Sequence, residues 1–217
     1  MPAIARLCAE LRRLELMGEL EKRLARAGFA AVAGVDEAGR GCLAGPVVAA
    51  AVVPDPSSPI LAVDDSKQLS PELRSRLAAA IRASARSWAV AEVSAAIIDA
   101  SDILSATRRA MLEAVRRLDP RPRAVVSDAV PLPELGLPAF ALVKGDALCY
   151  AVACASILAK EHRDRRLREL DRDFPHYGFV RHKGYAAAEH LAALARFGPS
   201  PVHRLSFGRV VPRREAA

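Results

Sequence analysis

Five short apolar runs, separated by longer amphipathic stretches, limit the folds open to this sequence of 217 residues. Each run is rich in Val and Ala and is bounded by turn-forming or charged residues, which is typical of buried β-strands. The predicted strands span residues 32–36, 47–53, 87–93, 124–127 and 139–143. A hairpin-like start followed by longer crossovers predicts an α/β fold with a mixed sheet and helices on its faces.

The stretches between the runs repeat apolar residues at three- and four-residue spacing, which predicts helices. They span residues 1–28, 71–81, 96–118, 147–170 and 186–197. Gly28 ends the first helix, which is expected to pack on the body, and Ser70 caps the second. Without a repeat or long linker, residues 1–217 are expected to form one domain. The N-terminal helix covers residues 1–28, a basic helical extension covers about residues 160–217, and residues 211–217 are expected to be disordered.

The positive charge gathers at the end of the chain. The formal net charge is +7, and residues 160–217 hold 13 Lys and Arg against 7 Asp and Glu. A basic surface of this kind suits a polyanion such as a nucleic acid. An Arg-rich solvated surface explains the charge equally well.

The sequence argues against secretion and membrane insertion. The longest uncharged stretches, residues 41–54 and 147–159, are shorter than the roughly 20 residues that span a bilayer. Charged residues interrupt the N-terminus, so it lacks the apolar core of a signal peptide. Four cysteines without CxxC spacing indicate a reducing compartment, and all four are expected to be buried. We therefore expect a cytoplasmic protein without membrane contact.

The densest candidate segment is GVDEAGRGCLAGP, residues 34–46. Its glycine spacing misses the dinucleotide-binding pattern, and it lacks the Lys-Ser/Thr of a P-loop. What remains is an acid pair, Asp36 and Glu37, at a strand end beside Arg40 in a glycine turn. Such a turn can present N–H groups and an Arg to a phosphate or sugar hydroxyl. The alternative is a solvated acidic turn with a structural Arg.

Two further acids follow predicted strands: Asp128 follows residues 124–127, and Asp146 follows the last strand and a Lys-Gly turn. If the first and fourth strands are parallel neighbours, Asp36 and Asp128 end at the same sheet edge, where α/β proteins place their sites. Converging carboxylates repel one another unless divalent cations neutralise them, and Mg²⁺ prefers oxygen ligands. The alternative for Asp146 is a favourable charge at a helix start.

Other hydrolytic sites are disfavoured. None of the five histidines shows a zinc-binding spacing, and the sequence contains no Gly-x-Ser-x-Gly elbow. The acids therefore favour phosphodiester hydrolysis with Mg²⁺ or Mn²⁺, with two ions when substrate is bound.

Eight motifs resemble the ribonuclease HII family, in the family's order and over about residues 32–209. They are GVDEAGRG-x-LAGPVV, DSKQLS, IDASDILSAT, KGD, ASILAK-x-x-RD, FPHYGF, HKGY and RLSFGR. The resemblance implies a ribonuclease H-like fold: a five-stranded mixed sheet flanked by helices, with a C-terminal helical extension. It also implies an endonuclease that cuts the RNA strand of RNA–DNA hybrids and incises 5′ of ribonucleotides embedded in duplex DNA. The ends would be a 5′-phosphate and a 3′-hydroxyl, and the role would be ribonucleotide removal in DNA replication and repair.

Motif position carries over the family's residue roles. The catalytic, metal-binding carboxylates correspond to Asp36, Glu37, Asp128 and Asp146. The sequence Gly39-Arg40-Gly41 matches the turn that contacts the ribonucleotide 2′-OH, the group that distinguishes RNA from DNA. Tyr185 matches the tyrosine that stacks on the adjacent deoxyribose, and a rim or core aromatic is the alternative.

Four more residues resemble backbone-phosphate contacts. Ser156 and Lys160 are four residues apart and share a helix face, and a plain surface pair is the alternative. Lys67 could reach a phosphate or cap a turn, and Lys183 is expected on the same basic wall.

The sequence departs from the family pattern at several positions. Ala129-Val130 follow Asp128 where Gly-Asn or similar is usual, so the turn after this strand is expected to differ. The other departures are Cys42, Asp102 and the pair Cys149-Tyr150. None removes a carboxylate, so activity is expected to survive.

Two rival functions stay open. Ribonuclease HIII usually carries an extra N-terminal domain, for which the roughly 30 residues before the first strand are too few. A non-catalytic nucleic-acid binder on this fold would need fewer acids, because unneutralised carboxylates repel phosphate. The protein is expected to be a monomer.

Overall fold

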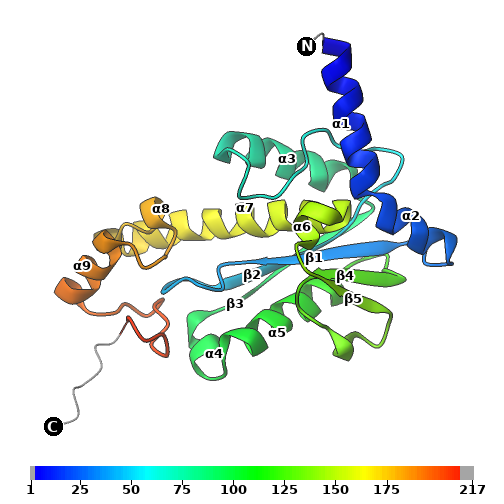
Figure 1. Ribbon diagram of the computed structural model, residues 1–217. Coiled ribbons are helices and arrows are strands. Elements are labelled where there is room, and N and C mark those ends of the chain that lie inside the picture. Colours follow the sequence, from blue (N-terminus) through cyan, green and yellow to red (C-terminus); the bar gives the residue numbers. More distant parts are fainter. Residues whose placement is uncertain (1–2, 211–217) are drawn as a thin grey trace.

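One mixed sheet organises the molecule. The computed structural model describes residues 3–210 (Figure 1), and the predicted disordered tail lies outside them. The strands are β1 (Val32–Ala38), β2 (Val47–Val53), β3 (Ser87–Val93), β4 (Ala124–Asp128) and β5 (Ala139–Leu142). Their order in the sheet is β3-β2-β1-β4-β5, with β1–β2 and β2–β3 antiparallel and β1–β4 and β4–β5 parallel. The predicted five-stranded mixed sheet is confirmed.

Helices cover both faces of this sheet (Figure 1). They are α1 (Ala3–Met17), α2 (Glu19–Arg26), α3 (Pro71–Ser84), α4 (Ala95–Asp99), α5 (Ile103–Arg116), α6 (Gly145–Leu148), α7 (Tyr150–Asp173), α8 (Phe179–His182) and α9 (Ala188–Phe197). Two single turns of 3-10 helix, Pro133–Leu135 and Pro175–Tyr177, complete the elements.

The central strands are buried because helices pack on both sides. Every residue of β2 is buried, and its side chains alternate between two cores. One core lies against α5, and the other lies against α7, α3 and α1. On the second face α7 crosses so close to β1 that a Cβ at Gly34 would lie 2.0 Å from the Ala151 carbonyl carbon. This close crossing fixes α7 over β1, the strand that carries Asp36.

Three predicted helices are each divided in two. Gly18 separates α1 from α2. Asp102 accepts hydrogen bonds from the Leu104 and Ser105 N–H groups, so it caps α5 and divides the predicted 96–118 helix into α4 and α5. Cys149 is extended and separates α6 from α7. In each case the apolar spacing continues across the break, so periodicity alone does not reveal it.

The N-terminal helices pack on the body only in part. Leu14 and Met17 are buried against the sheet, whereas Ile4 and Leu7 are exposed on the part of α1 that projects from the body (Figure 1). The expectation that the whole stripe packs is therefore wrong for its first half. Cys8 is exposed on the same segment, contrary to prediction, while the other three cysteines are buried.

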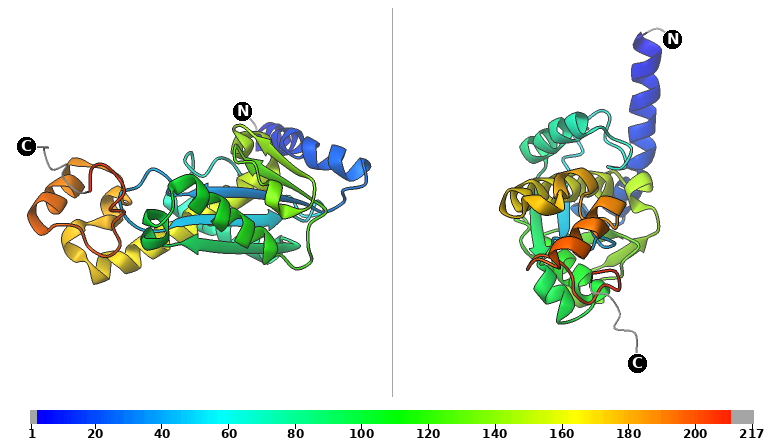
Figure 2. Two further views of the ribbon diagram at one scale, coloured as in Figure 1. Left: turned by 90° about the horizontal axis from the view of Figure 1, so that it is seen from below. Right: turned by 90° about the vertical axis from the view of Figure 1, so that its left-hand side faces the viewer.

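The C-terminal extension lies at the far end of α7 from α1 and α2 (Figure 2). Helices α8 and α9 enclose a small core of their own, which includes Leu43 and Ala44 from the loop after β1. An isolated bridge joins Ala44 to His203. The extension therefore holds the glycine-rich loop in place. Within residues 3–210, no helix is both long and apolar enough to cross a membrane.

Candidate active site

Three aspartates converge at the carboxyl ends of the parallel strands. Asp36 lies near the end of β1, and Asp128 is the last residue of the parallel neighbour β4. Asp146 lies in α6, just after β5. Each offers a carboxylate oxygen, and these oxygens all lie within 4.8 Å of one another. The predicted meeting of acids from three segments at one sheet edge agrees with this geometry.

A backbone hydrogen bond ties the last two acids together. The Gly145 N–H donates to Asp128 Oδ1 at 2.8 Å, which joins the end of β4 to the start of α6. Ala129 adopts a left-handed conformation with φ of 53° immediately after Asp128. The turn therefore forms with Ala where Gly is usual, and Asp128 still reaches the other two acids.

Glu37 lies beside the three aspartates and is engaged differently. Its Oε1 pairs with Arg40 Nη1 at 3.2 Å, while its Oε2 is buried and has no hydrogen-bond partner among the described residues. Its N–H donates to Asp36 Oδ1 at 2.7 Å. A buried carboxylate oxygen without a donor is a natural ligand for a cation.

The electrostatics of the cluster favour a cation. Burial, followed by the charges of Glu37 and Asp128, raises the pKa of Asp36 well above its usual value. Burial also raises the pKa of Glu37, and burial and the charge of Asp65 raise that of Asp146. The donor set consists of carboxylate oxygens, which suit Mg²⁺ or Mn²⁺. The residues present therefore fit the divalent ions that the sequence implies.

Two buried arginines contact the glycine turn beside the acids. Gly39 has φ of 96°, and a Cβ there would lie 2.0 Å from Nε of Arg163. Arg163, on α7, and Arg204, in the C-terminal extension, are both buried. Arg204 Nη1 donates to the Arg40 carbonyl at 2.8 Å. Only glycine allows the turn to lie this close to the guanidinium.

Tyr185 lies against the same turn. A Cβ on Gly41 would be 3.9 Å from its Cε1, and the Leu43 N–H donates to the Gly184 carbonyl at 2.7 Å. The tyrosine is 51% exposed, so its ring is available to a substrate. The structure thus brings Gly39, Arg40, Gly41 and Tyr185 together at one edge of the acid cluster.

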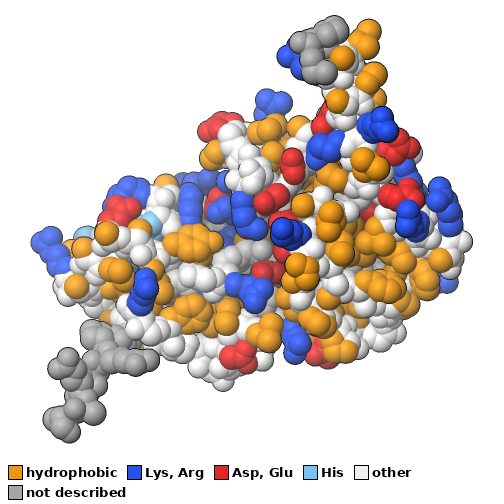
Figure 3. Space-filling view, viewed as in Figure 1, with side chains coloured by type: hydrophobic (Ala, Val, Ile, Leu, Met, Phe, Trp, Pro, Cys, Tyr) orange, Lys and Arg blue, Asp and Glu red, His pale blue; other side chains and the backbone are white. Residues whose placement is uncertain are grey.

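The predicted phosphate contacts other than Ser156 are lysines, and each lies near an acidic side chain. Lys67 Nζ lies 3.5 Å from Asp146 Oδ2, and the Lys67 side chain is 74% exposed. Lys160 Nζ pairs with Asp164 at 2.7 Å. Lys183 lies near Asp164 and Lys160, whose charges act on its pKa in opposite directions, and burial lowers that pKa overall. On the side of the molecule drawn in Figure 1 and Figure 3, Lys and Arg side chains lie beside Asp and Glu side chains near the middle.

Ser156 lies within α7 rather than at the surface. It is 2% exposed, and its hydroxyl donates to the Ala153 carbonyl at 2.9 Å. A phosphate contact there stays a prediction and requires this hydroxyl to become accessible.

The buried charges are what the sequence reasoning missed. Arg163 and Asp164 stand in the motif ASILAK-x-x-RD, but no role was predicted for them. Arg74 donates to Asp164 at 2.9 Å, and both side chains are buried. Arg204 opens the motif RLSFGR, but the motif assigns it no role, and its burial in the fold reveals one.

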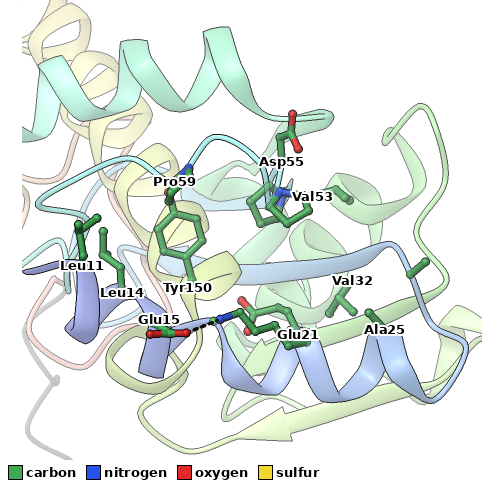
Figure 4. A pocket seen from close by; sticks show the side chains of 15 residues that line it. Leu11, Leu14, Glu15, Glu21, Ala25, Val32, Val53, Asp55, Pro59 and Tyr150 are labelled. Atoms are coloured by element: carbon green, nitrogen blue, oxygen red, sulfur yellow. Dashed lines mark ion pairs between the residues drawn. The ribbon is translucent and has the colours of Figure 1, made fainter.

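A separate apolar cavity of about 350 Å³ lies between α1–α2 and the ends of β1 and β2 (Figure 4). Val32, Val53 and Tyr150 contribute to its wall. Val32 begins β1, whereas Asp36 lies near the other end of that strand, so this cavity is distinct from the acid cluster.

Comparison with known proteins agrees with this geometry. A family model described as Ribonuclease HII matches residues 33–210. The ribonuclease HII of Solibacter usitatus is 52% identical over 188 residues, which cover 87% of this chain and 82% of that protein. The ribonuclease HII of Chloroflexus aurantiacus is 49% identical over 197 residues, covering 88% of this chain and 93% of that protein. The crystal structure of ribonuclease H2 from Pyrococcus horikoshii OT3 has a TM-score of 0.70 and 26% identity, covering 82% of this chain and 94% of that one. The chain therefore belongs to the ribonuclease HII family of metal-dependent endoribonucleases.

Proposed function

We propose that this endoribonuclease uses Asp36, Glu37, Asp128 and Asp146 to hold Mg²⁺ or Mn²⁺, with two ions when substrate is bound. The observation that carries the proposal is the convergence of three aspartates within 4.8 Å, at the carboxyl ends of two parallel strands and the helix after β5. Ions held there would neutralise phosphate oxygens and lower the pKa of water, which are the requirements of phosphodiester hydrolysis.

Substrate recognition is assigned to the surface around these acids. The turn at Gly39, Arg40 and Gly41 would contact the 2′-OH of a ribonucleotide, because its backbone groups can both donate to and accept from a hydroxyl. The exposed ring of Tyr185 lies beside Gly41, where it would pack on the neighbouring deoxyribose. This arrangement supports incision 5′ of a ribonucleotide embedded in duplex DNA as well as cleavage of longer hybrids.

The remaining assignments concern the phosphates and the setting. Lys67, Lys160 and Lys183 would bind the substrate backbone, and Ser156 would join them only if its hydroxyl becomes accessible. We propose that the protein acts as a single domain and as a cytoplasmic monomer. Its partner would be RNA–DNA hybrid or ribonucleotide-containing DNA.

A cleavage assay tests the site. The substrates are a duplex with one ribonucleotide, a long RNA–DNA hybrid and plain DNA, each with Mg²⁺, with Mn²⁺ and with EDTA. Asp36→Asn should lower the cleavage rate by at least about a hundredfold, since it removes one of the cation ligands. Asp173→Asn, which removes an exposed acid at the end of α7, is the matched control and should cut at the parental rate.

Three outcomes would contradict the proposal. Parental cleavage by Asp36→Asn would overturn the site assignment. Binding of the duplex without cleavage in Mn²⁺ would identify the non-catalytic binder. A marked preference for long hybrids over single ribonucleotides would favour a specificity like that of ribonuclease HIII.

A further inference from the structure

Two buried arginines hold the glycine turn: Arg163 connects the loop after it to the segment that carries Tyr185, and Arg204 connects the turn to the C-terminal extension. Arg163 and Arg204 are 1% and 0% exposed, although long charged side chains are rarely buried. Each comes from a different part of the fold: Arg163 from the middle of α7 and Arg204 from the C-terminal extension. Both contact the Gly39–Gly41 turn beside the acid cluster: Arg163 lies against Gly39, and Arg204 donates to the Arg40 carbonyl.

Within residues 3–210, every hydrogen bond from these two guanidinium groups goes to a backbone carbonyl. Arg163 donates to Pro46 at 3.2 Å, to Lys183 at 3.0 Å and to Ala44 at 3.1 Å. Arg204 donates to Gly45 at 3.1 and 2.9 Å and to Arg40 at 2.8 Å. Burial lowers the pKa of Arg204 to about 10, so the group is still charged at neutral pH. The fork of five N–H donors on an arginine suits several carbonyls at once, which a lysine cannot match.

The bonds of Arg204 fix the glycine turn itself, and those of Arg163 fix the loop after it relative to the Tyr185 segment. Arg163 bridges the loop after the turn, at Ala44, to Lys183, two residues before Tyr185. The contact is tight, because a Cβ on Gly184 would lie 2.7 Å from the Ala44 carbonyl oxygen. Tyr185 is held in turn, since its own carbonyl accepts from His190 Nδ1 at 2.8 Å.

We propose that Arg163 and Arg204 are positioning residues that set the spacing between the Gly39–Gly41 turn and Tyr185, and thereby the selectivity for a ribonucleotide followed by a deoxyribonucleotide. The proposal rests on the proposed function, in which the turn contacts the 2′-OH and Tyr185 packs on the next sugar. Two contacts to adjacent sugars discriminate only if their separation matches one nucleotide step, so a small displacement weakens the discrimination before it abolishes cleavage.

The experiment measures a ratio that a purely structural role would not change. The kcat/KM is determined for a duplex with one ribonucleotide and for a long RNA–DNA hybrid, with the parent, Arg163→Lys and Arg204→Lys. A partly unfolded variant loses the same fraction of activity on both substrates. Loss of positioning lowers the ratio of single-ribonucleotide to hybrid kcat/KM, by about tenfold if one sugar contact is lost.

Two further variants keep the test decisive. Gly184→Ala removes no charge but forces the Tyr185 segment away from Ala44, so it should lower the same ratio even if an arginine variant folds poorly. Arg74→Lys alters another buried arginine, which contacts Asp164 and not the turn, and it should leave the ratio unchanged. An unchanged ratio in Arg163→Lys, Arg204→Lys and Gly184→Ala would overturn the positioning role. A parent that shows no cleavage, or no dependence on a ribonucleotide, would instead overturn the proposed function.

Discussion

The Asp36 carboxylate is 5% exposed and lies among other acids, so its charge destabilises the fold that carries it. Without a divalent cation, Asp36→Asn removes this buried charge and keeps an oxygen that can accept from the Glu37 N–H. We expect a free energy of unfolding in EDTA about 1 kcal/mol higher than that of the parent, or about 2–4 °C in Tm.

Thermal unfolding with EDTA and with Mg²⁺ checks this. The ion should raise the Tm of the parent more than that of Asp36→Asn, because it binds the folded state through that ligand. Asp173→Asn removes an exposed acid and should behave like the parent in both buffers. A lower Tm for Asp36→Asn in EDTA would show that its carboxylate is stabilised by the fold rather than strained in it.

Ala129 carries a cost of a different kind. Its φ of 53° lies in the left-handed region, which costs a non-glycine residue about 1–2 kcal/mol. Glycine adopts this conformation without that cost, but it loses more backbone entropy on folding than alanine does. The net effect of Ala129→Gly should therefore be a free energy of urea unfolding that is about 0.5–1 kcal/mol higher, with cleavage unchanged. Ala79→Gly, in the interior of α3, should instead lower it by about 1 kcal/mol. Destabilisation by both substitutions would mean that the Ala129 turn is not strained.

At the scale of the elements, local signals predicted regular segments well and breaks poorly. The strand Ser87–Val93 lies where its apolar run predicts it, and Ser70 accepts from the Leu73 N–H as the predicted cap of α3. Asp102 shows the limit. Its side chain accepts hydrogen bonds from backbone N–H groups of α5, and this capping competes with a continuous helix through residues 96–118. Which of the two forms depends on how α4 and α5 pack, and local sequence does not reveal that.

The C-terminal extension contains a buried histidine network that sequence spacing did not explain. His203 contacts His190 at 3.0 Å and Ser200 Oγ at 2.8 Å, and His182 stacks on His190. Burial, together with the neighbouring His190, lowers the pKa of His203 from 6.5 to about 4. Phe179 packs on these rings, so the network belongs to the core that holds the glycine-rich loop.

This network should make stability depend on pH. Between pH 6.5 and about 4, the unfolded chain binds a proton at His203 that the folded protein excludes. The contribution of neutral His203 to the free energy of unfolding is therefore fully present above pH 6.5. This contribution, on the order of 3 kcal/mol, is lost as the pH falls towards 4. Urea unfolding at pH 7, 6 and 5 measures this slope. The slope should be shallower in His203→Asn and unchanged in His176→Asn, whose imidazole is exposed. Equal slopes in the parent and His203→Asn would assign the acid sensitivity elsewhere.

At the scale of the whole molecule, the acid cluster was predictable because strand polarity is regular. Asp36 lies near the end of β1, Asp128 ends its parallel neighbour β4, and Asp146 lies in the first turn of the helix after β5, so their meeting follows from topology. The burial of Ser156 and the placement of Arg204 follow from how α7 and the C-terminal extension dock. Neither depends on local sequence, so neither could be read from it.

The charge of the extension, which the sequence left open between nucleic-acid binding and plain solvation, can be decided by salt dependence. A lysine that neutralises a phosphate releases a counterion, so its loss lowers the slope of log Kd against log salt by about 0.9. Lys160 is the informative residue, because its Nζ already pairs with the buried Asp164 at 2.7 Å and so has a structural role without a phosphate. Binding should be measured in Ca²⁺, or with each substitution combined with Asp36→Asn, so that cleavage does not interfere. Lys160→Ala should lower the slope by about 0.9, whereas Arg26→Ala, exposed on α2 at the far end of the molecule, should not change it. If both variants keep the parental slope, Lys160 makes no phosphate contact, and its pairing with Asp164 is structural.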